Sequence, residues 1–447
     1  MLTVASLANQ FPSPVEPYVG EEIEELRRRG IRVTSGSVRK AKTPQEKALV
    51  AGCPPDVVLQ PLRVTVLLRA LVLCARRWKR ISPLMRRVLF RGRESPLRRV
   101  KALLHTWLGA CYAVMLAERK VDHIHVHHGF FGSWIAMTAA RLLDIGFSMT
   151  LYGSDLLLHR TYLDLKLDAC TLCFTVSEYN RRYILEHYPG VDPEKVVVWR
   201  VGVKVNQSAG ACREVFPESR SIQPADFTLL AVGRLHPVKD QAFLVRACAE
   251  LSSRGVNFSC LIAGAGPERC RLESLIRSCG LETRVAMLGF VPDEQMGPLY
   301  DRADVVVLTS RSEGIPLTLM EAMARGRIVL APAITGIPEL VIPEKTGFLY
   351  EPGSLGDFVD HLLLIRSLIE AQDCPNPSLR KVARQLDWIR HAARVHVRHN
   401  FNRKKNLESF CDFFIQQIAP NSESLPHEGS VLQQIQLSLQ RNRSLPV

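Results

Sequence analysis

The chain of 447 residues has no long apolar run. A membrane-spanning helix needs about 18 or more consecutive apolar residues, and no stretch of the sequence approaches that length. Residues 2–7 have the pattern of a strand, without the basic segment and long apolar segment of a secretory signal. We therefore expect no transmembrane helix and no signal peptide, and we expect the protein in the cytoplasm.

The sequence also lacks the cysteine spacing of a zinc site. Its twelve cysteines are scattered, mostly within apolar segments, which is typical of reduced, buried thiols. Cys170 and Cys173 form one CxxC pair, but no second pair lies at zinc-site spacing. We interpret the pair as part of the core; metal or redox chemistry there is the alternative.

Acidic residues are fewer than basic ones, 44 against 58, and the formal net charge is +14. Nucleic acid, an anionic membrane and phosphorylated substrates would all attract such a chain. The sequence has no aromatic-rich RNA-binding platform, zinc finger or other nucleic-acid motif. We therefore expect no nucleic-acid partner.

The basic residues concentrate in residues 63–101, where leucines, valines and Trp78 lie between them. A cationic amphipathic segment of this kind can lie on acidic lipid, on the inner face of a membrane. A solvated helical face that covers the first domain explains the pattern equally well. The basic residues are Arg63, Arg69, Arg76, Arg77, Lys79, Arg80, Arg86, Arg87, Arg91, Arg93, Arg98, Arg99 and Lys101.

The stretch 309–326, TSRSEGIPLTLMEAMARG, is the most informative part of the chain. A buried strand is predicted for 304–308, and Pro316 suits the first turn of a following helix, because proline lacks the N–H that would be unpaired there. Gly326 suits the left-handed residue just past the helix end. Such a helix start attracts phosphate through unpaired N–H groups and a partial positive charge.

Two carboxylates flank this helix start, Glu313 in the loop and Glu321 on the helix. They lie eight residues apart, which is at most ~12 Å of helix. That span suits a sugar at one end of a diphosphate and a ribose at the other. An ordinary strand–helix unit with two surface glutamates is the alternative.

Short apolar runs alternate with helical patterns along both halves of the chain, which predicts an α/β protein with parallel sheets. We expect a first domain at 1–205, an interdomain linker at 206–224 and a second domain at 225–391. A helix over 392–419 would brace the first domain, and the polar stretch 420–447 is predicted to be a disordered tail. In the first domain, strands are predicted at 2–7, 31–35, 123–127, 148–152, 172–176 and 196–201.

The pair Glu313 and Glu321 resembles the E-x7-E signature of the retaining glycosyltransferases of family 4. Further stretches resemble that family in order along the chain, namely FTLLAVGRL at 227–235, LIAGAGP at 261–267, 285–292, GIPE at 336–339 and TGFL at 346–349. Residues 11–23 are similar to the subgroup that builds exopolysaccharides such as colanic acid. The resemblance implies the GT-B fold, two Rossmann-like doubly wound parallel-sheet domains facing a central cleft, with the acceptor bound by the first domain and the nucleotide sugar by the second.

The resemblance also implies roles for residues of the second domain. Arg234 and Lys239 would offset the charge of the departing diphosphate without a metal ion, a task that suits both side chains. Glu313 would contact the donor sugar, and Glu321 would accept hydrogen bonds from the ribose. Arg234, Lys239 and Glu313 are the predicted catalytic residues; surface charges beside a glycine turn are the alternative for the two cations. The predicted donor-binding residues are Gly233, Gly264, Gly266, Gly314, Ile315, Pro316, Leu317 and Glu321.

In the first domain, His123, His125 and His127 alternate along one predicted strand. Three imidazoles on one face could bind zinc or nickel, and a purely structural role is a further alternative. Because the segment resembles the family's HxHxxF strand, we expect His127 or His128 to contact the cleft, and we expect no metal.

The sequence departs from the family pattern at two positions. Tyr152, before the Gly153–Asp155 loop, stands where family members commonly have histidine, and tyrosine, with an ordinary pKa of ~10, is a poor base at neutral pH. Lys204 stands where the family often has aspartate. We count Tyr152 and Asp155 with His127 and His128 as candidate acceptor or cleft residues.

These observations predict a retaining, metal-independent, hexosyltransferase-type enzyme. It would move a sugar from a nucleoside-diphosphate sugar to a glycan or lipid-linked acceptor in exopolysaccharide or cell-surface glycan synthesis, with no further cofactor. A non-catalytic nucleotide-sugar-binding protein and a sugar-nucleotide epimerase are the alternatives.

Overall fold

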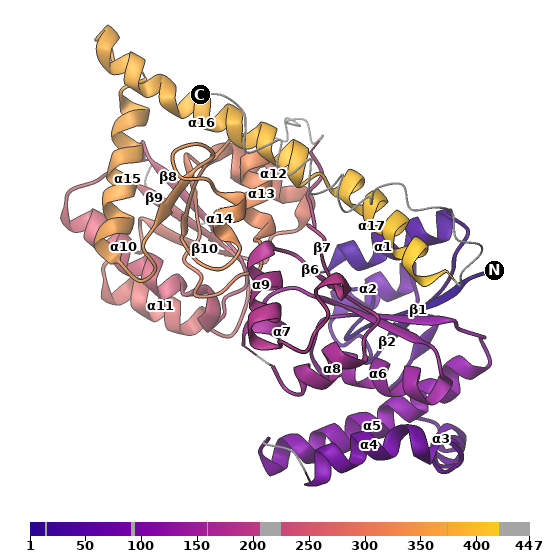
Figure 1. The fold of residues 1–447 in the computed structure, drawn as a ribbon. Helices are drawn as coiled ribbons and strands as arrows, with labels where there is room; N and C mark the ends of the chain where they lie inside the picture. Colours follow the sequence, from indigo (N-terminus) through magenta and orange to yellow (C-terminus); the bar gives the residue numbers. More distant parts are fainter. Residues whose placement is uncertain (14–15, 91–93, 159, 206–224, 373, 420–447) are drawn as a thin grey trace.

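The computed structural model describes residues 1–13, 16–90, 94–158, 160–205, 225–372 and 374–419, and these form two α/β domains (Figure 1). The predicted linker at 206–224 and the predicted tail at 420–447 lie outside the described residues. Each domain is built on one sheet in which every paired strand is parallel.

The first sheet has the strand order β3-β2-β1-β4-β5-β6-β7. The chain builds outward from β1 in one direction and then, from β4, in the other. This is a doubly wound sheet whose order reverses between β1 and β4. Its strands are β1 (Thr3–Ala8), β2 (Arg32–Ser37), β3 (Val57–Val58), β4 (His123–His127), β5 (Gly146–Leu151), β6 (Leu172–Thr175) and β7 (Val196–Val198).

The second sheet has the order β10-β9-β8-β11-β12-β13, which reverses between β8 and β11. In doubly wound sheets, ligands bind beyond the carboxyl ends of the strands at such a reversal. The predicted class, two doubly wound parallel-sheet domains, is confirmed. The strands are β8 (Thr228–Val232), β9 (Ser259–Ala263), β10 (Val285–Gly289), β11 (Val305–Val307), β12 (Ile328–Pro332) and β13 (Phe348–Tyr350).

Helices cover the sheets. Those of the first domain are α1 (Pro17–Arg28), α2 (Pro44–Gly52), α3 (Val64–Arg76), α4 (Trp78–Phe90), α5 (Pro96–Ala117), α6 (Phe131–Leu143), α7 (Ser154–Leu157), α8 (Leu163–Ala169) and α9 (Glu178–His187). Those that follow are α10 (Gln241–Ser253), α11 (Arg269–Ser278), α12 (Asp293–Arg302), α13 (Leu317–Ala324), α14 (Ile337–Leu340), α15 (Leu355–Glu370), α16 (Pro377–Asn400) and α17 (Arg403–Ile418).

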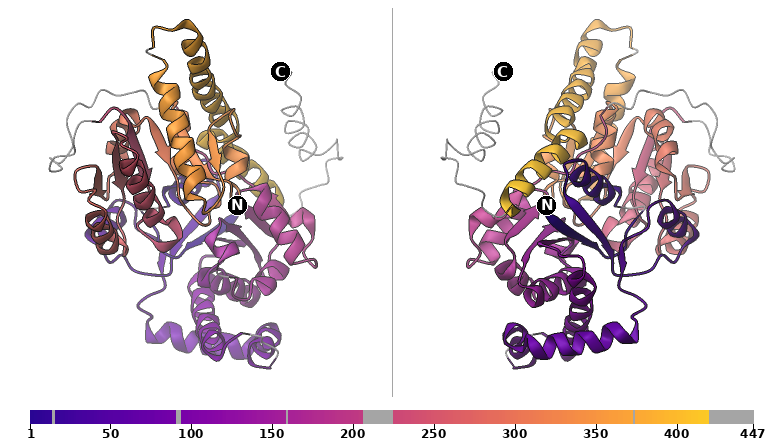
Figure 2. Two further views of the ribbon diagram at one scale, coloured as in Figure 1. Left: turned by 90° about the vertical axis from the view of Figure 1, so that its left-hand side faces the viewer. Right: turned by 90° about the vertical axis from the view of Figure 1, so that its right-hand side faces the viewer.

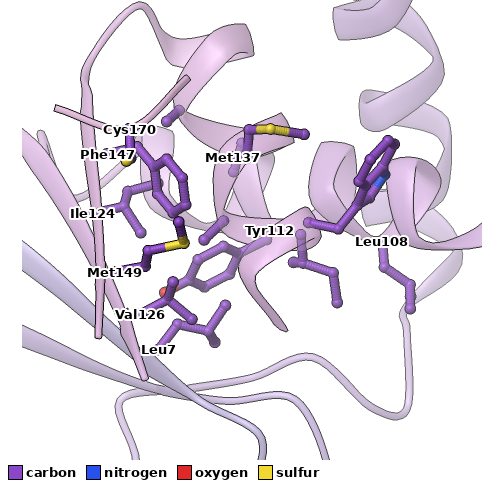
Figure 3. Packing of buried hydrophobic residues seen from close by; sticks show 14 of the residues in the cluster. Leu7, Leu108, Tyr112, Ile124, Val126, Met137, Phe147, Met149 and Cys170 are labelled. Atoms are coloured by element: carbon purple, nitrogen blue, oxygen red, sulfur yellow. The ribbon is translucent and has the colours of Figure 1, made fainter. Parts of the chain in front are cut away.

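The core of the first domain lies between its sheet and helices α5 and α6 (Figure 3). Tyr112 of α5 and Met137 of α6 are fully buried against Ile124, Val126 and Met149 of the central strands. A second apolar cluster, which includes Phe174 of β6 and Phe410 and Phe414 of α17, lies apart from this core. Near-continuous burial is what parallel strands require.

The basic segment folds into three helices that the sequence did not resolve. Helices α3 and α4 and the first half of α5 extend from the first sheet on the side away from the second domain (Figures 1 and 2). By length and composition α5 is the one helix among the described residues that could cross a membrane. Half of that stretch is buried, and α5 packs on α3 and α6, so protein partners already cover much of its apolar surface.

The predicted single helix over 392–419 is wrong in its bounds. Helix α16 starts earlier, at Pro377, and packs on α13, α15 and β12 of the second domain. The chain then leaves the helical conformation at Phe401, and the Asn402 side chain caps the start of α17. Helix α17 packs on α1, where Phe410 and Phe414 join the core of the first domain. The two helices therefore run along both domains (Figure 1).

Candidate functional site

The loop between β11 and α13 holds the predicted pair of carboxylates as expected, with Glu313 in the loop and Glu321 on the helix. Gly326 has φ +68°, the predicted left-handed conformation just past the helix. Pro316 lies one position earlier than predicted, as the N-cap residue. Among the described residues no side chain caps this helix start, so its first N–H groups have no side-chain acceptor. Gly314 and Ile315 precede them in the loop.

Lys239 and Glu313 meet at the carboxyl ends of β8 and β11. The Lys239 Nζ lies 2.5 Å from Glu313 Oε1, and both side chains are largely buried, 19% and 12% exposed. The Thr309 hydroxyl donates to the carbonyl oxygen of Lys239 at 2.9 Å, which fixes the turn that carries the lysine. The structure thus brings together a predicted cation and a predicted carboxylate from sequence positions 74 residues apart.

Arg234 lies near the same strand end, and its side chain is exposed. The Gln241 side chain donates to its carbonyl oxygen at 2.9 Å. The positive charge of its guanidinium group is close enough to the first domain to help lower the pKa of the Glu16 carboxyl. Arg234 therefore lies near the junction of the two domains, and its role stays a prediction.

The structure explains why Gly264 and Gly266, which follow β9, are glycines. The sequence alone did not indicate this reason. A Cβ atom on Gly264 would collide with the carbonyl oxygen of Gly233, and one on Gly266 would collide with that of Leu235. The backbone of the neighbouring turn therefore fills the space beside these two glycines. The two strand-end turns touch each other directly.

Glu321 is bound within its own domain. The Tyr300 hydroxyl donates to Glu321 Oε2 at 2.7 Å. Burial raises the pKa of Glu321, and the bond from Tyr300 opposes that effect. One carboxylate oxygen is thereby fixed by Tyr300, a residue that the sequence did not single out.

In the first domain, His128 lies between two carboxylates. Its Nε2 is 2.7 Å from Glu16 Oε1, and its Nδ1 is 3.6 Å from Asp155 Oδ2. Burial alone would lower the pKa of His128, but the two carboxylates outweigh it and raise that pKa to about 10. His128 is therefore a cation at neutral pH. Its backbone has φ +71°, a left-handed conformation that few non-glycine residues adopt.

Tyr152 is held by His127 and cannot serve as a base. The His127 Nδ1 lies 2.9 Å from the Tyr152 hydroxyl. Burial, with the nearby Tyr18 and two carboxylates, raises the pKa of Tyr152 well above its ordinary value. Tyr152 can donate a hydrogen bond but stays protonated. Lys204, the second departure, lies 3.6 Å from Glu21 and is largely exposed.

The three histidines of β4 do not come together as one set of possible metal ligands, which was an alternative interpretation of the sequence; two of them lie beside Glu22. Glu22, His125 and His127 have potential ligand atoms within 4.8 Å of one another, and all three residues are buried. His123 lies apart and bonds to Ser148. Both ring nitrogens of His125 already bond to Ser148 and Thr150, which suits a structural role. Glu22 was missed because a glutamate on a helix is expected to face solvent.

The two domains touch at their strand-end loops. A Cβ atom on Gly314 would collide with the carbonyl oxygen of Tyr152. Beside this contact, the Glu339 carboxylate of the second domain accepts hydrogen bonds from the N–H groups of Glu178 and Tyr179, at 3.0 and 2.8 Å. Glu339 thus caps α9 of the first domain. It belongs to the GIPE motif, so the sequence drew attention to it without giving its role.

Two family models match the chain. The model described as "Glycosyltransferase Family 4" matches residues 15–207, and the model "Glycosyl transferases group 1" matches residues 213–376. They meet close to the predicted domain boundary.

Curated relatives and solved structures agree with these matches. The putative colanic acid biosynthesis glycosyltransferase WcaL of Salmonella typhimurium is 37% identical over 168 residues, 36% of this chain and 39% of the relative. WcaL of Escherichia coli is 32% identical over 221 residues, 48% of this chain and 50% of the relative. The chain therefore matches half or less of the length of these relatives. The crystal structure of HepE of Anabaena in complex with UDP is 18% identical, covers 93% of this chain and 100% of that one, and has a TM-score of 0.63.

Proposed function

Because the chain belongs to glycosyltransferase family 4 and has the GT-B fold, we propose that it transfers a sugar from a nucleoside-diphosphate sugar to a glycan or lipid-linked acceptor. The observation that carries this proposal is the convergence of Lys239, Glu313 and the uncapped start of α13 at the strand ends of the second domain. The UDP in the HepE complex supports a nucleotide donor. The names of the WcaL relatives support a role in exopolysaccharide synthesis.

The transfer is proposed to proceed with retention and without a metal ion. The bond between the sugar C1 and the β-phosphate oxygen breaks, and a bond forms between C1 and the acceptor oxygen. Lys239, Arg234 and the N–H groups of α13 would stabilise the negative charge that develops on the diphosphate, as preorganised positive charge does in other enzymes. Since Tyr152 stays protonated, the acceptor proton would pass to the leaving phosphate oxygen.

A donor panel tests this function. The protein is incubated with UDP-, GDP- and ADP-sugars, and binding, hydrolysis and transfer are measured. We expect one nucleotide to bind and to raise the melting temperature, because a ligand at ~100 times its Kd stabilises by ~2.7 kcal/mol. Release of the nucleoside diphosphate supports the transferase. Binding without turnover would identify a non-catalytic binding protein, the alternative suggested by Tyr152. Formation of a new sugar nucleotide would identify an epimerase.

Attachment to the inner face of an anionic membrane is the second part of the proposal, with the enzyme otherwise cytoplasmic. Helix α3 exposes Val64, Leu68 and Leu71, at 70%, 61% and 57%, beside basic residues of the same segment. Apolar side chains flanked by cations are the pattern of helices that lie in the surface of acidic bilayers.

Liposome flotation tests this attachment. We expect the protein to float with vesicles that contain phosphatidylglycerol and to stay in solution with phosphatidylcholine alone. Leu68→Glu should abolish flotation, whereas Val382→Glu, which changes an equally exposed apolar residue on α16, should leave it unchanged. Equal partition into both kinds of vesicle would remove the electrostatic part of the proposal.

A further inference from the structure

The first domain contains a cavity of about 490 Å³ that the proposed function has not used. It lies between α5, the start of α6 and the loop before α8. Its volume is within the range of ligand pockets, ~300–1,000 Å³. Neither Arg234 nor the loop from Glu313 to Leu317 lines it, so this cavity is not the donor site.

One wall of the cavity is aromatic. Phe131 and Trp134 of α6 face Tyr162 at the start of α8, and the rings of Trp134 and Tyr162 are 4.9 Å apart. Tyr162 has φ +52°, a left-handed conformation that is strained for a bulky side chain and is retained where the surroundings impose it. Trp134 and Tyr162 are each 2% exposed and form the back of this wall, so the half-buried ring of Phe131 is the apolar surface that the C–H face of a sugar could contact.

The polar lining of the cavity is cationic. Arg98 and Lys101 of α5 are exposed at its edge, whereas Lys166 is buried, 3% exposed, and burial lowers its pKa to about 7, so the two exposed side chains supply the positive charge. Among the residues that line the cavity, none is acidic. Asn9 adds a neutral acceptor, since its buried Oδ1 has no hydrogen-bond partner among the described residues. A ligand that supplies both a hydroxyl donor and a negative charge would satisfy this lining.

The cavity adjoins the junction of the domains through the loop after β4. Lys166 donates to the carbonyl oxygens of Gly129 and Phe130, at 2.6 and 3.0 Å, and the Asp155 carboxylate accepts from the N–H of Gly129 at 2.8 Å. Gly129 and Phe130 line the cavity, while His128 precedes them at the interdomain site. The cavity therefore lies beside the loop that carries His128.

We propose that this cavity binds the terminal sugar of an acceptor that carries an anionic group, with the sugar against Phe131 and the anion at Arg98 and Lys101. The inference deepens the proposed function and rests on it. The anion has two possible sources, the diphosphate that joins a glycan to a lipid carrier and the carboxylate of a uronic acid within the glycan. Both would engage the same two cations.

Direct binding and transfer test the proposal with three probes: glucosyl farnesyl diphosphate, a disaccharide that contains glucuronic acid, and the matching neutral disaccharide. The Arg98→Ala/Lys101→Ala variant is compared with Arg76→Ala/Lys79→Ala, which removes the same two kinds of charge from exposed positions outside the cavity. We expect the first variant to weaken binding of the anionic probe by on the order of 10- to 100-fold, the loss of two charge-assisted hydrogen bonds. Binding of the neutral disaccharide and of the nucleotide should not change.

Preference for one anionic probe identifies the source of the anion. Equal losses in the two variants, or no binding of either anionic probe to the unmodified protein at millimolar concentration, would overturn the proposal. Because binding is measured by calorimetry without donor, this result stands apart from the donor panel. If the protein binds nucleotide and hydrolyses donor, but the Arg98→Ala/Lys101→Ala variant binds the anionic probe as well as the unmodified protein does, the proposed function stands and the proposal for the cavity is wrong. Phe131→Ala should weaken the anionic and neutral probes alike.

Discussion

Replacing Lys239 with alanine is expected to lower turnover by on the order of 10²-fold or more, by analogy with the loss of one preorganised charge-stabilising group. The lysine is held at the strand end by Glu313, so its charge is in place before the donor arrives. Because the charge on the diphosphate develops during bond breaking, the loss should appear mainly in kcat. Arg234→Ala should have an effect of similar size. The measurement is donor hydrolysis or transfer with saturating nucleotide sugar.

Two variants separate this role from damage to the fold. Lys239→Arg keeps the positive charge and should recover part of the lost turnover. Arg246→Ala removes an exposed cation from α10 and should leave turnover unchanged. Full turnover of both Lys239→Ala and Arg234→Ala would contradict the assignment of these residues to the diphosphate.

Replacing His128 with glutamine is expected to destabilise the folded protein by ~3 kcal/mol at neutral pH, since removing one partner of a buried ion pair costs ~3–5 kcal/mol. We use the lower limit of this range of free energies because the backbone N–H groups of Gly129 and Gly153 continue to donate to Asp155. The variant leaves Glu16 and Asp155 without the cation between them. Urea denaturation of both proteins measures the difference.

The pH dependence identifies the cause. The pKa of His128 is raised to about 10 from an ordinary 6.5, so its contribution is complete below pH ~6.5 and is lost as pH rises through 10. The pKa values of Glu16 and Asp155 are lowered despite burial, chiefly by His128, so their contribution is lost at acid pH. The difference between the two proteins should therefore shrink steadily from pH 6.5 to 10. A difference that does not change over this range would contradict the ion pair.

The sequence was sufficient for features that depend on neighbours along the chain. The alternation of apolar runs predicted both sheets, and the strand at 123–127 has the predicted bounds. Gly326 follows α13 as expected, because the end of a helix is a local event. The loop position of Glu313 and the helical position of Glu321 follow from the same local signals.

Features that depend on contacts between distant residues could not be predicted in this way. Glu16 and His128 are 112 residues apart, and nothing in their local patterns indicates an ion pair. Arg98 and Lys101 of α5 line the same cavity as Tyr162 only in the folded protein. From the sequence they were therefore recognised only as members of the basic segment. The break between α16 and α17 depends on Val203, whose N–H and carbonyl group bind Phe401 and Arg403 across the chain.

The position of Glu339 has a consequence for product release. Its carboxylate, which lies 3.4 Å from Arg200, accepts from the first two N–H groups of α9, while Ser177 of the first domain accepts from the N–H of Asn180. If the chain is the transferase proposed above, any parting of the two domains that releases nucleotide would have to break these two hydrogen bonds. They would then add to the barrier for domain opening, a step that sets the turnover of many enzymes of two domains.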